Sequence, residues 1–248
     1  MRKFFTDFEY IDGMNEIKID ENEAKHILKV LRLKIGDRFI ISNFHNQSFE
    51  SQIVNDDLKC CVVKLINKVD ITNKSNVNIT IFQGYPKGDK LDLIVQKLTE
   101  LGVKEIFPIL TKRTVVKFNP SKFKLERLQK ISKEACKQCG ISTIPHINTP
   151  IEFESIDEKF LSKYDLILIP YENNFQSLKK VLREREDAKN ICVFIGSEGG
   201  FELEEVEKIK GFGGVSVSLG QRILRTETAS IFISSVLQYE FGDVQQKF

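Results

Sequence analysis

The sequence predicts an α/β protein with a mainly parallel sheet, preceded by a small unit that is mostly β. Three short, continuous apolar runs at residues 165–169, 191–195 and 215–219 are typical of strands covered on both faces. Stretches with helical periodicity lie between these runs, which indicates crossover helices. Each of the last two runs ends in a loop that contains glycine and opens a helix, and ligands of open α/β sheets bind at such loops.

The bulk properties indicate an ordinary globular chain. Hydrophobic residues make up 41% and charged residues 29% of the 248 positions, and the net charge is only +2. Contacts with nucleic acid must therefore come from local clusters of Lys and Arg. No apolar run reaches the roughly 18–20 residues that span a bilayer, and the N-terminus lacks the apolar core of a secretory signal. With an odd number of cysteines, 5, we expect reduced thiols and a cytoplasmic protein that does not enter a membrane.

Residues 1–72 are expected to form the small unit, with one helix and several strands in a barrel-like arrangement. Asp20 can cap a helix over residues 21–31, where Ala24, Ile27, Leu28 and Leu31 share one face. Gly36 and Asp37 turn the chain into a first strand. The expected strands are 38–42, 48–54 and 59–67. The polar, aperiodic stretch 70–76 places the domain boundary between residues 72 and 73.

Residues 73–248 are expected to alternate strands and helices. Besides the three apolar runs, strands are predicted at 77–82 and 104–110. A helix over 90–101 ends at Gly102, a residue typical of helix C-termini. The other predicted helices are 119–139, 176–183, 202–210 and 226–241.

The first glycine loop is Gly196-Ser197-Glu198-Gly199-Gly200. Its glycines would let the main chain approach a ligand closely. A simple strand-to-helix turn without a ligand explains the same residues about equally well. The loop is neither a dinucleotide fingerprint nor a Walker loop, so a phosphate site has little support.

The second loop, 219–229, favours a functional site. Arg222 and Arg225 lie three residues apart at the start of a helix, where cations oppose the helix dipole. Local conflicts of this kind are expected at functional sites. The alternative, a surface pair between Arg225 and Glu227, would contribute little stability.

Basic residues gather on the first predicted helix, where Lys25, Lys29 and Arg32 follow each other at i, i+4 and i+7. This stripe could follow a phosphate backbone, although a solvated helix face is the alternative. Arg2 in the same unit strengthens the RNA interpretation. A second basic run, 112–117, contains Arg113. Cys136 and Cys139 have only His146 nearby, so we expect no metal site.

Several of these segments carry the motifs of a known family. The matching stretches are 26–33, 36–37, 87–90, 96–103, 134–138, 196–201 and 219–229. On these residues the chain resembles the SPOUT class of knotted RNA methyltransferases, and within it the family of ribosomal RNA small-subunit methyltransferase E. The sequence departs from the family pattern at two places. The family usually has proline at the position of Ser197 and arginine at or near the position of Ile141.

The resemblance implies a PUA-like RNA-binding domain at residues 1–72 and a SPOUT domain with a trefoil knot at 73–248. It implies a homodimer that acts on ribosomal RNA of the small ribosomal subunit, with S-adenosylmethionine as its cofactor. The implied cofactor-binding residues are Ile169, Pro170, Tyr171, Ile195, Gly196, Glu198, Gly199, Gly200, Leu219, Gly220, Ile223, Leu224 and Arg225. The expected RNA contacts are Arg2, Lys25, Lys29, Arg32, Lys87, Arg113 and Arg222.

The implied reaction is methylation of uridine N3, a nitrogen that carries a proton. Arg225 is expected to stabilise or position the base after proton loss, and Glu198 and Glu227 are the candidate general bases. Three alternatives stay open: a non-catalytic RNA-binding adaptor, methylation of another RNA base by the same fold, and a phosphate- or nucleotide-binding enzyme.

Overall fold

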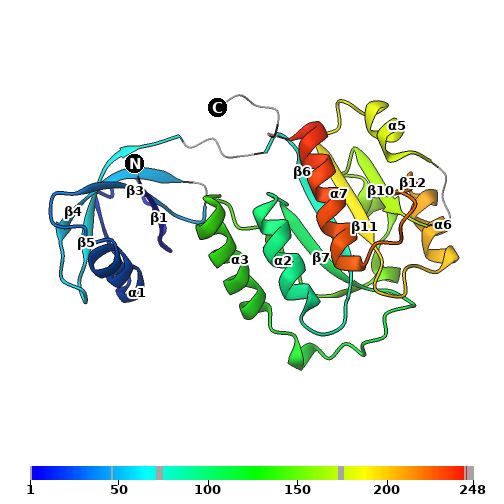
Figure 1. The fold of residues 1–248 in the computed structure, drawn as a ribbon, viewed down its shortest axis with the longest axis horizontal. Coiled ribbons are helices and arrows are strands. Elements are labelled where there is room, and N and C mark those ends of the chain that lie inside the picture. The colour runs from blue at the N-terminus through cyan, green and yellow to red at the C-terminus, as the bar shows by residue number, and fades with distance from the viewer. Residues whose placement is uncertain (1, 46, 71–74, 173–175, 243, 245–248) are drawn as a thin grey trace. The chain divides into compact units, whose positions relative to one another are not determined.

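The structure, a computed structural model, describes residues 2–45, 47–70, 75–172, 176–242 and 244 (Figure 1). The chain divides into two compact units, Met1–Asn73 with Cys136–Ile144, and Lys74–Ala135 with Pro145–Phe248. The predicted boundary between residues 72 and 73 lies outside the described residues. Among the described residues, no helix has both the length and the apolarity that a membrane span requires.

The smaller unit contains a five-stranded sheet in the order β1-β3-β4-β5-β2. The strands are β1 (Lys3–Phe5), β2 (Glu16–Lys18), β3 (Arg38–Ser42), β4 (Ser48–Asn55) and β5 (Val62–Lys68). β1 runs parallel to β3, and the other pairs are antiparallel. Phe39, Ile41 and Val63 are completely buried and form the core with the helix described next. The predicted β unit is confirmed; β1 and β2 are too short to stand out in the sequence.

The helix of this unit begins at the predicted cap. The Asp20 carboxylate accepts hydrogen bonds from the main-chain N–H groups of Asn22 and Glu23, and α1 (Glu21–Lys25) follows. The helix continues as the wider π-helical turn η1 (His26–Val30). Directly after it, Arg32 has a φ of +57°, the only positive φ of a non-glycine residue in the described part of the chain.

The larger unit contains a seven-stranded sheet in the order β12-β10-β11-β6-β7-β8, with β9 paired to β7, and every pair is parallel. The strands are β6 (Asn78–Gly84), β7 (Glu105–Leu110), β8 (His146–Ile147), β9 (Ile151–Glu152), β10 (Leu166–Pro170), β11 (Asn190–Ile195) and β12 (Val215–Val217). The mainly parallel α/β sheet is confirmed. The two-residue strands β8 and β9 were not predicted.

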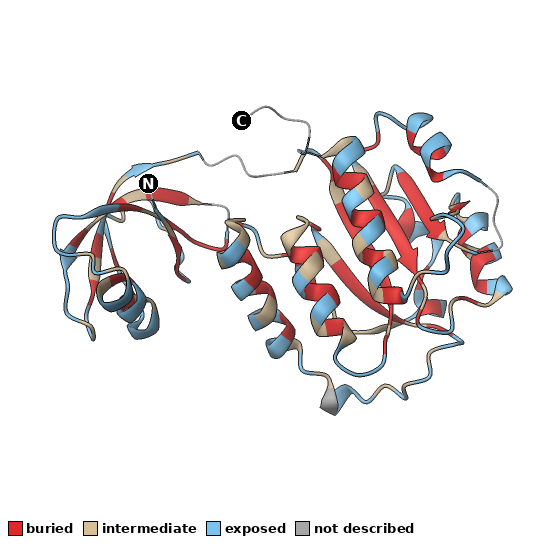
Figure 2. Cartoon of the chain, viewed as in Figure 1, coloured by how far each residue is buried: buried red, intermediate tan, exposed pale blue. Residues whose placement is uncertain are grey.

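Helices cover both faces of this sheet, which explains its continuous apolar strands (Figure 2). One face packs on α2 (Lys90–Glu100), α3 (Leu125–Cys139), α5 (Leu178–Arg183) and α7 (Thr226–Phe241). The other packs on α4 (Glu158–Leu161) and α6 (Leu203–Gly211). Along β6, Ile79 and Ile81 point to the first face, and Phe82 points to the second. There Phe82 stacks on Phe194 with ring centroids 4.4 Å apart.

The predicted helix over 119–139 is wrong in its first part. The chain instead forms a short 3-10 turn, η2 (Pro120–Lys122), and α3 starts only at Leu125. Phe123 is extended between them, with φ −75° and ψ 115°. Its ring lies against Tyr85 and Phe118, so tertiary packing of an aromatic side chain overrides the local helical pattern.

The end of α3 belongs to the smaller unit. Lys3 Nζ donates to the main-chain oxygen of Gly140 at 2.8 Å and to Ser142 Oγ at 2.9 Å. Lys137 forms an ion pair with Glu23. Nothing in the local sequence of Cys136–Ile144 signals this assignment, because its partners lie more than 90 residues earlier.

Candidate functional site

Three loops leave the sheet at the same edge. β10 lies between β11 and β12 and runs parallel to both, so the segments after Pro170, Ile195 and Val217 emerge side by side. The main-chain N–H of Tyr171 donates to the Val217 oxygen at 3.0 Å. The structure therefore brings together the two glycine loops and the implied cofactor-binding segment at residues 169–171, at the strand ends where α/β proteins bind ligands. These are the three loops of the candidate site: 169–171, 195–200 and 219–225.

The predicted cofactor residues differ in what they can offer a ligand. Ile169 and Ile195 are buried, so only their main-chain groups are candidates. Glu198, Gly199, Gly220, Ile223 and Arg225 are exposed, and Pro170, Tyr171, Gly196, Gly200, Leu219 and Leu224 are half-buried. Ile223 is 84% exposed, an unusual state for a large apolar side chain.

The first glycine loop is a tight turn packed against the end of β6. The Gly200 N–H donates to the Ser197 oxygen at 2.9 Å, and Gly200 has a φ of +71°. A Cβ added to Gly196 would lie 2.8 Å from the Gly200 Cα, and one added to Gly84 would lie 2.2 Å from the Ser197 nitrogen. The end of β6 and the loop therefore approach so closely that both Gly84 and Gly196 must lack a side chain.

A buried chain of hydrogen bonds joins this loop to the start of α7. Thr226 Oγ1 donates to the Gly196 oxygen at 2.6 Å and accepts from Gln83 Nε2 at 2.8 Å. The Gln83 Oε1 atom accepts from Ser230 Oγ. The side chains of Gln83, Thr226 and Ser230 are buried, so these hydrogen bonds replace the ones that their polar groups would otherwise make with water. Sequence reasoning missed Gln83, although a glutamine directly after the apolar residues of this strand is a usable signal.

Lys90 forms an ionic bridge between the same two segments. Its Nζ lies 2.8 Å from Glu198 Oε1 and 3.5 Å from Glu227 Oε2. Glu198 also accepts the Lys87 N–H at 3.1 Å. Burial raises the pKa of Glu198, but the hydrogen bonds from Lys90 and from main-chain N–H groups outweigh it, so the pKa lies below its ordinary value. Glu227 Oε2 is buried and accepts no hydrogen bond.

Arg225 is the N-cap residue of α7, and its side chain is exposed. Within the described residues its guanidinium forms no hydrogen bond or ion pair, and the predicted alternative of a pair with Glu227 is not observed, because Glu227 faces Lys90. A guanidinium in this state keeps all its donors for a ligand.

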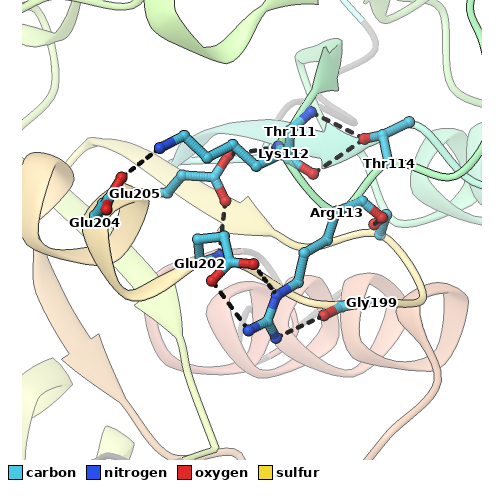
Figure 3. Close-up of polar contacts among 9 residues, drawn as sticks. Thr111, Lys112, Arg113, Thr114, Gly199, Glu202, Glu204 and Glu205 are labelled. Carbon is cyan, nitrogen blue, oxygen red and sulfur yellow. Dashed lines mark hydrogen bonds and ion pairs between the residues drawn. The ribbon is translucent and has the colours of Figure 1, made fainter.

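Arg113, which the sequence suggested as an RNA contact, is bound to protein groups beside the first glycine loop. Its Nε and Nη2 donate to the two Glu202 carboxylate oxygens at 2.8 and 3.1 Å, and its Nη1 donates to the Gly199 oxygen at 3.1 Å (Figure 3). The guanidinium therefore lies against the glycine loop. The distance of 89 residues between Arg113 and Glu202 hides this pair from local sequence analysis.

The other predicted RNA contacts are exposed. Arg2, Lys25, Lys29 and Arg32 belong to the smaller unit, and Lys87 and Arg222 to the larger one. Lys25 pairs with Glu21 at 2.7 Å. Among the described residues no group of three His, Cys, Asp or Glu side chains is arranged to hold a metal ion.

Comparison with known proteins identifies the family. A family model described as an RNA methyltransferase domain matches residues 73–238, and one described as an RNA methyltransferase PUA domain matches residues 19–65. A ribosomal RNA small subunit methyltransferase E from Buchnera aphidicola is 33% identical over 93% of this chain and 90% of its own length. The chain belongs to the ribosomal RNA small subunit methyltransferase E family.

Solved structures of the family share the fold. A ribosomal RNA small subunit methyltransferase E from Neisseria gonorrhoeae, bound to S-adenosyl methionine, is 27% identical, covers 99% of this chain and 100% of its own, and has a TM-score of 0.82. A methyltransferase from Legionella pneumophila, in complex with the same cofactor, is 30% identical over 98% of both chains with a TM-score of 0.81. The predicted resemblance and fold class are confirmed, and the chain is a methyltransferase; the trefoil knot stays a prediction.

Proposed function

We propose that this chain transfers a methyl group from S-adenosylmethionine to N3 of a uridine in small-subunit ribosomal RNA. Family membership and the cofactor-bound relatives support the reaction class. The observation that carries the assignment of the site is the meeting of three loops at one sheet edge, beside Arg225, whose guanidinium has no partner among the described residues.

The residues of the three loops fit this cofactor. A Cβ built on Gly200 or Gly220 meets no atom within 4 Å, so both glycines border open space. Main-chain groups of these loops can bind the polar parts of the cofactor, and the exposed Ile223 offers an apolar contact. When bound, the cofactor supplies an electrophilic methyl group on its sulfonium.

Proton removal from uridine N3 creates a negative charge on the base. The Arg225 guanidinium stabilises this charge or positions the base, as preorganised donors do in other active sites. Both candidate bases lie beside Lys90, whose Nζ is 2.8 Å from Glu198 and 3.5 Å from Glu227. We favour Glu227, because its contact with Lys90 is the longer one and its Oε2 accepts no hydrogen bond, whereas the hydrogen bonds to Glu198 lower the pKa of that carboxylate.

The RNA is held by basic residues of both units. Arg2, Lys25, Lys29 and Arg32 contact phosphates through the smaller unit, and Lys87 and Arg222 contact the RNA near the three loops. The N3 edge of uridine pairs with adenine in a duplex, so the target is unpaired or extruded when it is modified.

The working enzyme is a homodimer in the cytoplasm, acting on the small ribosomal subunit or its RNA. Exposed apolar side chains on and before α7 support an association of two copies. Phe232 is 41% and Ile223 84% exposed. A second copy that covered these side chains would remove their apolar surface from water.

Arg225→Ala tests the role of the arginine. We expect kcat for methyl incorporation into ribosomal RNA to fall about 100-fold or more, because a donor to a developing anion is lost. The free energy of unfolding should stay the same or rise by about 0.5 kcal/mol, since a cation at a helix N-terminus is removed.

Isothermal titration calorimetry with S-adenosylmethionine and mass spectrometry of the RNA product complete this experiment. A folded wild-type protein that binds no S-adenosylmethionine would rule out the proposed function. An unchanged kcat in Arg225→Ala would leave the function intact and remove Arg225 from its mechanism.

A further inference from the structure

We infer that Arg113 is a positioning residue for cofactor binding, which holds the glycine loop Gly196–Gly200 in its binding conformation. This inference rests on the proposed function, in which that loop binds S-adenosylmethionine. It replaces the expectation from sequence that Arg113 contacts RNA.

The planar guanidinium of Arg113 donates hydrogen bonds to two partners, Glu202 and Gly199. Two nitrogens engage both oxygens of Glu202, and the third engages the Gly199 main-chain oxygen (Figure 3). Only a guanidinium can make this set of bonds, because a lysine ammonium lacks the flat, divergent donors. Arg113 thus joins the glycine loop to the residue that begins α6.

The main chain of Arg113 touches the loop as well. Its carbonyl oxygen accepts a hydrogen bond from Ser197 Oγ at 3.2 Å. A Cβ added to Gly199 would lie 2.9 Å from the Arg113 Cβ and 3.1 Å from the Arg113 oxygen. The loop therefore packs on Arg113 from its second to its fourth residue.

The partner Glu202 is itself fixed. It is the N-cap residue of α6, and its N–H donates to Glu205 Oε2 at 2.8 Å. The Glu205 side chain is 1% exposed, and its other oxygen accepts the Lys112 N–H at 2.9 Å. Lys112 and Arg113 are thus both hydrogen-bonded to the start of α6, through Glu205 and Glu202. These bonds fix the position of Arg113, which in turn binds the Gly199 oxygen.

The same contacts argue against a role in RNA binding. Every side-chain nitrogen of Arg113 already donates to a protein oxygen. Hydrogen bonding to Glu202 raises the pKa of Arg113, and the same bond lowers the pKa of Glu202, so the pair is fully ionised and locally neutral. The Glu202 carboxylate beside the guanidinium cancels most of its charge and would repel a phosphate, which disfavours the approach of RNA.

A double-mutant cycle with Arg113→Lys and Glu202→Gln tests this inference. Each single variant should weaken S-adenosylmethionine binding about 5-fold, and the double variant should bind about as weakly as either single variant, because both break the same link. KM for S-adenosylmethionine should rise by a similar factor while kcat changes little. RNA affinity and its salt dependence should stay at the wild-type level in both variants. This holds even though Arg113→Lys keeps the charge and Glu202→Gln removes a negative charge.

Two further variants make the outcomes distinct. Lys117→Ala removes a cation from the same segment; Lys117 is exposed and makes no polar contact with the described residues, so cofactor affinity should not change. Gly196→Ala damages the glycine loop directly, since its Cβ would lie 2.8 Å from the Gly200 Cα.

If Gly196→Ala loses cofactor binding while Arg113→Lys and Glu202→Gln retain wild-type affinity, the inference about Arg113 is wrong and the proposed site stands. If folded Gly196→Ala binds the cofactor like the wild type, the site is misplaced and the inference is overturned with it. Additive losses in the cycle, or an RNA affinity that falls in Arg113→Lys but not in Glu202→Gln, would also contradict it.

Discussion

At the scale of single residues, Arg32 combines a strained backbone with a long side chain that is expected to contact RNA. Its φ of +57° is a conformation that non-glycine residues adopt at a cost of about 1 kcal/mol. The residue follows the π-helical turn η1, and its side chain is exposed. Strain that stability does not require is common at binding sites, and here it accompanies one of the expected RNA contacts.

Arg32→Gly and Arg32→Ala separate the two effects. Both remove the guanidinium, so both should weaken RNA binding by a similar factor and reduce its salt dependence. Only glycine relieves the strain, so Arg32→Gly should be more stable than Arg32→Ala, by about 0.5–1 kcal/mol. Thermal unfolding and salt-dependent RNA titrations measure the two quantities. Equal stability of the variants would show that the backbone is not strained.

The residues that the sequence could reveal are those whose chemistry is visible locally. Arg225 and Glu198 stand out because a cation at a helix start and an acid among glycines are both unusual. Lys90 and Gln83 could not be assigned a role, since their partners Glu198 and Thr226 lie more than 100 residues away. Arg113 was predicted to contact RNA because a basic run is visible in the sequence, whereas its carboxylate partner Glu202 is not.

At the scale of elements, the approach of two main chains decides the shape of the glycine loop. β6 and β11 pair in parallel register from Asn78 with Asn190 to Gln83 with Ile195. The next residue of β6, Gly84, lies directly against the turn, where a Cβ would be 2.2 Å from the Ser197 nitrogen. A main-chain neighbour at this distance cannot rotate away as a side chain could.

Gly84→Ala should therefore displace the loop. We expect a loss of about 1–3 kcal/mol in the free energy of unfolding, the usual cost of an overpacked site, together with much weaker S-adenosylmethionine binding. Gly211→Ala is the matched control, because Gly211 lies in α6 and a Cβ there meets no atom within 4 Å. Chemical denaturation and calorimetry measure both quantities; a Gly84→Ala protein with wild-type stability would show that the loop tolerates the approach.

The link between Lys90 and Glu198 should appear in the pH dependence of stability. Because the pKa of Glu198 is lowered from its ordinary 4.5, the ionised carboxylate stabilises the fold above that pH, and this contribution disappears as the pH falls through the lowered pKa. Wild type should be more stable than Glu198→Gln at about pH 6, and the difference should shrink as the pH falls below the ordinary pKa of a glutamate. A constant difference in melting temperature across this range would contradict the assignment.

Helices and strands could be predicted from the sequence where their hydrophobic periodicity continues over enough residues. The strands of the large sheet other than β8 and β9, and α7, were predicted to within a few residues, because their patterns extend over several residues. The short strands β1, β2, β8 and β9 carry no such pattern, and the interruption of a helix at Phe123 depends on distant aromatic rings. These features follow from tertiary contacts rather than from local sequence.

At the scale of the whole molecule, the proposed homodimer predicts a distinct role for α7. Phe232→Asp should weaken self-association, because a charge replaces an exposed apolar side chain that the second copy would bury. Leu203→Asp on α6 is the control, since Leu203 is 60% exposed and is given no part in the interface. Sedimentation velocity over a range of concentrations compares the two. A Phe232→Asp protein that dimerises like the control would place the interface elsewhere.

The helix α3 starts in one compact unit and finishes in the other, since Cys136–Ile144 groups with the N-terminal residues. A hybrid enzyme that exchanges only the first 73 residues with those of a relative would separate Lys3 from Gly140 and Glu23 from Lys137. Recombination between family members must therefore transplant two separate stretches of the gene together to carry over the complete smaller unit.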